Sequence, residues 1–325
     1  LGRISETGGD RDAALPMVLR ARRERPAEPQ AARLAAAELR LNLKLGRYAR
    51  ARALGDSLLV MWAGPDPAVA TVLAGVSALV GHVQRTAELL RIAYRDSGLA
   101  LPNLEPVRAP VAVVEAALDL FAYAALGAPR DTLLALERRV NQVVGAYVEP
   151  VGGRRTLARY AALDEPAVLA YPVLGVRPVH RGSAPDYVME MQLAASRGDT
   201  AIVRSWITKL DTIRRIQRPG DVAIDGTYLE AWVQLQMGDS AAAIERLDAS
   251  LNALPALGLN LVEQVPQAAG LVRAMAWRAD LASRATDAAT ARAWAEAVVT
   301  LWSGADEVLQ PTVARMRTLS AGTKR

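Results

Sequence analysis

Pairs of amphipathic segments joined by a glycine recur along this chain. In residues 235–255, LQMGDSAAAIERLDASLNALP, an apolar segment ends before Gly238, and the next segment places Ala243, Leu247 and Leu251 on one helical face. Glycine ends a helix in a left-handed conformation without steric cost, and a neighbouring Asp or Ser can accept the free amides of the next helix. The pattern therefore predicts an antiparallel helical hairpin.

The same pattern occurs in residues 43–59, 79–93 and 195–210. The glycines, each with the small or apolar residue five positions later, are Gly46 with Ala51, Gly81 with Thr86, Gly198 with Val203 and Gly238 with Ala243. Weaker copies surround Gly127 and Thr286. A period in the thirties, made of two helices, is typical of an α-solenoid.

The second helix of each hairpin has a face that we expect to be buried. In two of the hairpins these faces are Ala243, Ile244, Leu247 and Leu251, and Ile202, Val203, Trp206 and Leu210. One hairpin cannot bury such a face alone, so neighbouring hairpins must stack. The sequence therefore predicts an all-α fold, a right-handed superhelix of roughly seven helical pairs when the length is divided by the repeat.

The hairpin signature resembles the tetratricopeptide repeat. Its Gly-x-Tyr-x-x-Ala element is literal at Gly46, Tyr48 and Ala51. The aromatic residue that this family has early in the first helix is replaced in three of the units, by Ala35, Ala70 and Thr227. The resemblance therefore implies a related α-solenoid more than a set of regular tetratricopeptide repeats.

The C-terminal residues 291–316 carry a second resemblance. Their LWSGADEVLQP motif has a helix ending in Trp, a Gly-Ala-Asp break and a short helix. This stretch is similar to the end of the repeat region of bacterial receptor-like Ser/Thr kinases and of repeat-bearing transcriptional regulators. Since no kinase motif is present in the sequence, the resemblance implies the sensor or interaction part of a bacterial signalling protein.

Two proline-containing stretches, residues 95–110 and 163–186, interrupt the helical rhythm. The second contains Pro166, Pro172, Pro178 and Pro185, which prevent a long helix. We therefore expect an N-terminal repeat array over 1–162, an irregular linker or loop over 163–186 and a C-terminal repeat array over 187–325.

One strongly apolar stretch, residues 67–81, is too short to cross a bilayer, which takes about 18–20 residues. It predicts a buried helix. The chain begins with Leu and shows no signal-type start, so we interpret it as a processed product or a fragment of a longer protein.

The net charge of +5 comes from the N-terminal region, because residues 1–60 hold 12 Arg and Lys against 7 Asp and Glu. A run of arginines near the N-terminus has no interleaved aromatic residues and no recognisable DNA-recognition helix beside it; its members are Arg20, Arg22, Arg23 and Arg25. We interpret it as a solvated helix end, and nucleic acid is not the expected partner.

Chemistry that depends on cysteine or clustered histidines is not expected. The chain has no Cys and only two His, so thiolate metal sites are excluded and a protein-built zinc site would need distant carboxylates. No phosphate-binding loop, His-Glu-x-x-His pair or nucleophile elbow occurs. We expect neither a metal nor a cofactor.

His82 follows the hairpin glycine Gly81, so it predicts a capping or exposed turn residue. His180 lies in the irregular segment with other residues that can donate hydrogen bonds or present aromatic faces. The candidate ligand-binding residues are Tyr171, Arg177, His180, Arg181 and Tyr187. The alternative is a surface loop that only packs across the solenoid.

Five of the tryptophans, Trp206, Trp232, Trp277, Trp294 and Trp302, follow helical periodicity and are expected in the core. Repeat architecture without a catalytic motif favours a non-catalytic scaffold that binds a protein or peptide in a concave groove. One alternative is a structural subunit that self-associates by stacking, because head-to-tail contacts that do not close produce filaments. An enzyme with an unfamiliar site around His180 is a third hypothesis. The identity of the partner, the oligomeric state and the side of a membrane are left open.

Overall fold

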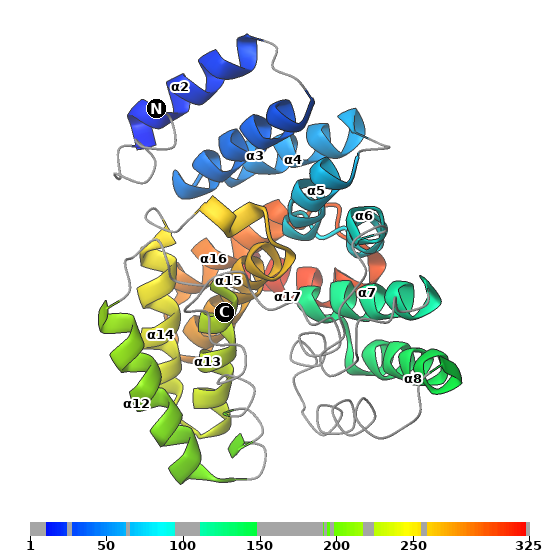
Figure 1. The fold of residues 1–325 in the computed structure, drawn as a ribbon. Helices are drawn as coiled ribbons and strands as arrows, with labels where there is room; N and C mark the ends of the chain where they lie inside the picture. The colour runs from blue at the N-terminus through cyan, green and yellow to red at the C-terminus, as the bar shows by residue number, and fades with distance from the viewer. Residues whose placement is uncertain are drawn as a thin grey trace.

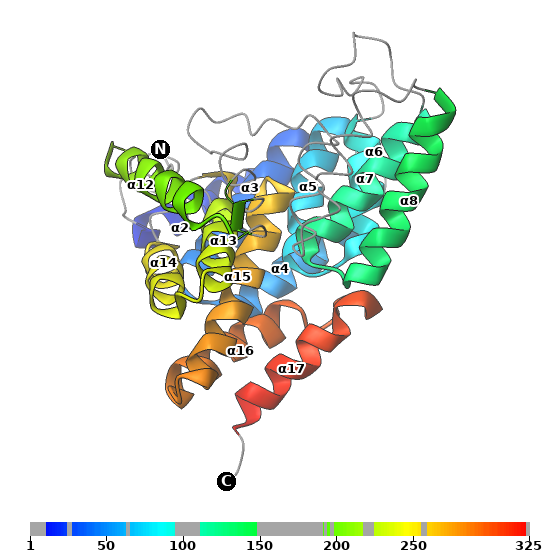
Figure 2. The same ribbon diagram turned by 90° about the horizontal axis from the view of Figure 1, so that it is seen from below.

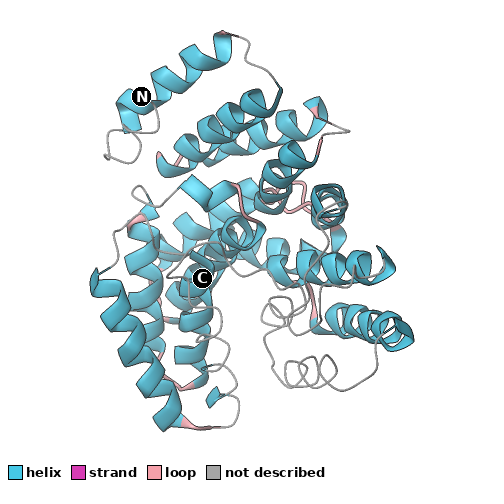
Figure 3. Ribbon diagram, viewed as in Figure 1, coloured by secondary structure: helices cyan, strands magenta, loops and turns pink. Residues whose placement is uncertain are grey.

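The computed structural model describes residues 11–24, 28–62, 66–94, 111–147, 191, 194–195, 198–216, 224–254 and 259–322. Within these ranges the regular elements are all helices (Figure 3). The predicted all-α fold is confirmed for this part of the chain.

Most of the helices form pairs joined by short turns (Figure 1). In chain order the elements are α2 (Arg11–Arg23), α3 (Glu28–Lys44), α4 (Tyr48–Met61), α5 (Pro67–Leu79), α6 (Val83–Tyr94), α7 (Val111–Leu126), α8 (Arg130–Tyr147), α12 (Thr200–Ile216), α13 (Ile224–Gln236), α14 (Ser240–Asn252), η3 (Leu259–Val262), α15 (Val265–Arg284), α16 (Ala288–Leu301), η4 (Glu307–Leu309) and α17 (Gln310–Ala321). Among the described residues, hairpins are formed by the pairs α3–α4, α5–α6, α7–α8, α13–α14 and α15–α16.

The predicted turn residues adopt the left-handed conformation. Their φ angles are 70° at Gly46, 83° at Gly81, 78° at Gly127, 73° at Gly198, 78° at Gly238 and 61° at Thr286. The two weaker sequence copies therefore form the same kind of turn as the stronger ones. The residues five positions after the four clear glycines are fully buried, as expected for the closest crossing of two helices.

The predicted buried face of α14 is confirmed, because Ala243, Leu247 and Leu251 lie in the core and Ile244 packs against it. On α12, Val203 and Leu210 are buried and Trp206 packs against their cluster. Ile202 was predicted to lie on the same face, but its side chain is 46% exposed. The prediction for Ile202 is wrong because it lies at the edge of the apolar stripe, about one helical step from Val203.

The apolar stretch predicted to be a buried helix forms α5. Asp66 begins this helix, since its side chain accepts a hydrogen bond from the amide of Val69 at 2.9 Å, and Pro67 fits the first turn. The helix is buried from Val69 to Leu79 except at Thr71. Among the described residues, no helix is long and apolar enough to cross a membrane.

Helix α15 lies at the centre of the molecule. It contacts α5 and α7 from the N-terminal region and α13, α14, α16 and α17 from the C-terminal region (Figures 1 and 2). Gly75 of α5 permits close packing beside it, because a Cβ at this position would lie 2.3 Å from the carbonyl oxygen of Val262 in η3. One hydrophobic cluster runs from Ala32 to Met316.

The two predicted arrays therefore share a hydrophobic core across the sequence gap between them. Residues 163–186, where the boundary was placed, lie outside the described residues. The division into two arrays stays a prediction.

Helix α17 is the last helix that the structure describes. It buries Val313 and Met316 toward α15 and α16, while Arg317 and Thr318 are exposed and Arg315 pairs with Asp280 of α15 at 3.1 Å. The apolar face of α17 therefore packs against the preceding hairpin.

Candidate functional site

The five candidate loop residues, Tyr171, Arg177, His180, Arg181 and Tyr187, lie outside the described residues. Their role as a ligand-binding site therefore stays a prediction. The polar cluster that the structure does describe surrounds the other histidine, His82, in the turn between α5 and α6.

His82 holds the hairpin turn through its backbone. Its amide donates to the carbonyl of Ser77 at 3.0 Å, and its carbonyl accepts from the amide and the hydroxyl of Thr86 at 2.9 and 2.8 Å. The Ser77 hydroxyl donates to the same carbonyl at 2.9 Å. The imidazole is 27% exposed and lies between two carboxylates, 3.9 Å from Asp56 and 3.6 Å from Asp306.

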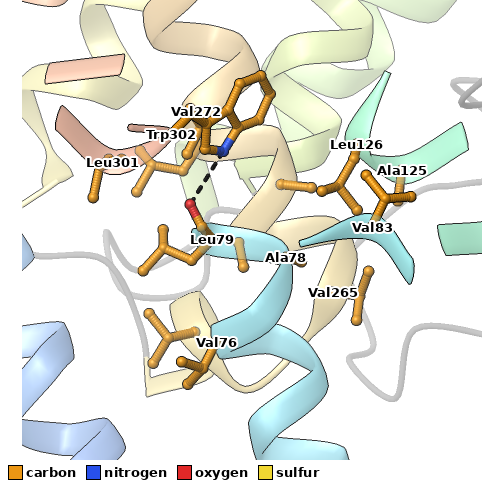
Figure 4. Close-up of a cluster of buried hydrophobic side chains, with 14 of the residues drawn as sticks. Val76, Ala78, Leu79, Val83, Ala125, Leu126, Val265, Val272, Leu301 and Trp302 are labelled. Atoms are coloured by element: carbon orange, nitrogen blue, oxygen red, sulfur yellow. Dashed lines mark hydrogen bonds between the residues drawn. The ribbon is translucent and has the colours of Figure 1, made fainter. Parts of the chain in front are cut away.

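The last carbonyls of α5 and of the turn receive hydrogen bonds from distant elements. Helix ends leave such carbonyls without a partner inside the helix. The indole nitrogen of Trp302 donates to Leu79 at 3.2 Å, as Figure 4 shows, and the Arg52 guanidinium donates to Val80 at 2.6 Å. The amide of Asp306 donates to Gly81 at 3.0 Å. Three consecutive carbonyls are thus satisfied by α4 and by the region after α16.

The start of α6 depends on the same distant region. The amide of Gln84, in the first turn of α6, donates to the carboxylate of Asp306 at 2.9 Å. Gly81 allows this approach, because an added Cβ would lie 2.7 Å from the Cβ of Ala305 and 3.0 Å from the Trp302 ring. Asp306 therefore contacts both ends of the turn, at Gly81 and at Gln84.

Arg52 connects three elements at this site. Besides Val80, its guanidinium donates to the carbonyl of Leu301 at the end of α16, at 3.2 Å, and pairs with Asp56 at 2.9 Å.

Burial raises the pKa of the Tyr123 phenol in α7, and the carboxylates of Asp306 and Asp119 raise this pKa further. The phenol is therefore neutral at physiological pH and remains able to donate a hydrogen bond.

The two carboxylates that face His82 approach opposite nitrogens of its ring, Asp56 at Nε2 and Asp306 at Nδ1. This arrangement bridges two helical elements and does not direct three ligands at one point. Across the described ranges, no group of three or more His, Cys, Asp and Glu side chains is placed to hold a metal ion.

A second arginine makes a similar contact between α15 and α7. Arg273 donates to the carbonyls of Ala124 and Ala125 at the end of α7, at 3.2 and 3.3 Å. Its guanidinium also lies 4.1 Å from the ring centre of Tyr228 and donates to the hydroxyl of Tyr228 at 2.6 Å. Arg273 therefore joins α7, α13 and α15.

The expected packing of the tryptophans is confirmed. Trp232 and Trp302 are buried, and Trp206, Trp277 and Trp294 pack partly buried against the core clusters.

The large apolar side chains that remain exposed are distributed over three helices. They are Met17 on α2, Val60 and Met61 on α4 and Ile202 on α12.

The N-terminal arginines are partly engaged in ion pairs. Arg20 is exposed beside Glu24, with 3.9 Å between their charged atoms, and Arg22 pairs with the buried Glu38. Arg50 reaches Glu38 from α4 at 3.3 Å. These contacts support helix packing around α3.

Local sequence reasoning identified the turn at Gly81 but not its partners. Arg52 and Asp306 are far from the turn in sequence, and neither belongs to a known motif on its own. The signal that was available is the LWSGADEVLQP motif, whose Trp302, Ala305 and Asp306 form the contact surface.

No family model matches the chain, and no curated protein matches it. Among solved structures, it is similar to a tetratricopeptide repeat protein from Parabacteroides merdae, with 11% sequence identity and a TM-score of 0.32. The match covers 98% of this chain and 96% of that chain. The assignment of the fold rests on the helices and turns described above.

Proposed function

We propose that this chain is a non-catalytic repeat scaffold that binds a protein or peptide, and that it serves as the interaction region of a bacterial signalling protein. The observation that carries the proposal is the repeated helical hairpin with a left-handed residue at each turn. Stacked hairpins present extended surfaces for partners. The signalling role is supported by the resemblance of residues 291–316 to repeat regions of signalling proteins.

The polar clusters in the described ranges support a scaffold role. The charged groups of Arg52, Asp306 and Arg273 contact the ends of neighbouring helices. Such contacts fix the relative positions of helices, which a binding surface requires.

The concave groove remains the proposed place for the partner. Helices α5 and α7, the first helices of their hairpins, pack against α15 on one side. The partner would therefore bind surfaces of the hairpins that α15 does not cover. Exposed apolar side chains such as Val60, which is 78% exposed, offer contact points outside the core.

The alternative is self-association by stacking of chain ends. The exposed Arg317 of α17 counts against stacking on this helix, because a stacked copy would have to desolvate its charge. We therefore favour a different protein or peptide as partner.

The experiment is affinity capture with the purified chain, followed by calorimetric titration of each captured protein after separate purification. The proposal expects saturable binding with a fixed stoichiometry. The matched control is Ala243→Asp, which places an unpaired charge at a fully buried position of α14 and should abolish binding by preventing packing.

Two results would overturn the proposal. One is that no captured protein binds as a pure component. The other is that the chain turns over a small-molecule substrate and that His180→Ala removes this turnover.

A further inference from the structure

The turns of the hairpins differ in what surrounds them. At Gly46, Gly198 and Gly238 an added Cβ would meet no atom within 4 Å among the described residues. At Gly81 it would lie 2.7 Å from Ala305 and 3.0 Å from Trp302, and at Gly127 it would lie 2.8 Å from the Arg273 side chain. The turns at Gly81 and Gly127 therefore contact distant parts of the chain, and the turn at Gly81 is the one that contacts the residues after α16.

The helix that follows this turn also lacks a local cap. The side chains of Asp66, Asp239 and Asp287 each accept an amide of the helix that begins directly after them, at 2.9, 2.9 and 3.1 Å. At α6 the corresponding residue is His82, whose side chain faces two carboxylates, and the amide of Gln84 donates to Asp306 instead. The capping group of α6 comes from 222 residues further along the chain.

We propose that residues 301–309, named here the latch segment, couple the opening of the α5–α6 turn to the opening of η4 and α17. The latch segment supplies the donors for the carbonyls of Leu79 and Gly81 and the acceptor for the amide of Gln84. When it leaves, all three groups lose their protein partners together. Local opening of one region therefore exposes the other.

The coupling extends beyond the turn. Arg52 holds the carbonyls of Val80 and Leu301, one on each side of the contact. The latch segment is therefore connected to α4, α5 and α6, and these helices open together with η4 and α17.

Hydrogen exchange of the full-length chain, with and without Asp306→Ala, tests this proposal. Loss of a helix cap should accelerate exchange of the first-turn amides of α6 about fivefold, and exchange in η4 and α17 should accelerate together with them. The matched control is Asp239→Ala, which removes a local cap and should accelerate exchange in α14 alone.

Asp306→Asn provides a variant of the same size that keeps an oxygen acceptor. It should shift the same two regions by less than Asp306→Ala does, and it remains measurable if the alanine variant does not fold. Acceleration confined to residues 301–322, with the first turn of α6 unchanged in either variant, would overturn the proposal.

Discussion

At the residue scale, Gly81 and Gly238 have the same backbone conformation but different surroundings. Both have φ near +80°, where an L side chain is strained. Only at Gly81 would a side chain also collide with the latch segment. Substitution at Gly238 therefore measures the free-energy cost of the backbone conformation alone, and substitution at Gly81 adds the cost of a steric collision.

Gly238→Ala should lower the free energy of unfolding by about 1 kcal/mol, since the left-handed conformation alone is penalised. Gly81→Ala should cost about 2 kcal/mol more, because Ala305 and Trp302 must move. Urea denaturation of both variants measures the difference. Equal losses would show that the latch segment does not press on this turn.

Thr286 occupies a turn position that glycine holds in the other hairpins, at φ 61°. Thr286→Gly relieves the strain of about 1–2 kcal/mol but increases the entropy of the unfolded chain. The net expectation is a gain of about 0.5 kcal/mol in the free energy of unfolding. Thr286→Ala serves as control and should give no comparable gain, since alanine keeps the strain. A loss of stability on Thr286→Gly would show that the left-handed conformation of Thr286 does not strain the folded state.

At the element scale, the hairpins could be predicted from sequence because their signal is local. A turn glycine and a small residue five positions later fix where one helix ends and where the next crosses it. The predicted buried face of α14 is confirmed. The predicted burial of Ile202 is wrong, because periodicity does not resolve the edge of an apolar stripe.

The contact between α15 and α17 gives a pH prediction. Burial raises the pKa of Asp280, against the opposing effect of Arg315, whose Nε lies 3.1 Å from the carboxylate, and of Arg284. A raised pKa means that the folded state disfavours the ionised form, so this group stabilises the fold at acidic pH and loses that contribution as pH rises.

Asp280→Asn should therefore have a higher Tm than the parent chain at pH 7, and the difference should shrink as pH falls through the range where carboxylates titrate. Thermal unfolding followed by circular dichroism at several pH values measures both. Arg315→Gln is the matched variant, and it should lower Tm at pH 7 by removing the opposing charge. A Tm of Asp280→Asn below that of the parent chain at every pH would reverse this assignment.

At the scale of the whole molecule, the central position of α15 could not be predicted. Its contacts with α5 and α7 join residues that are far apart in sequence, and hydrophobic periodicity indicates only that a face is buried, not which helix covers it. The same reason explains why the roles of Arg52 and Asp306 were missed. The role of the irregular segment around His180 as a ligand-binding site stays a prediction.

We propose that the molecule is a scaffold whose partner is another protein or peptide. The hydrophobic core that runs from Ala32 to Met316 favours a particle of fixed size.

Light scattering coupled to gel filtration, over about a hundredfold range of concentration, distinguishes such a scaffold from a self-associating subunit. We expect a constant mass, that of the 34.7 kDa chain or of a fixed small oligomer. A mass that grows with concentration without limit would contradict it, because the chain would then be its own principal partner.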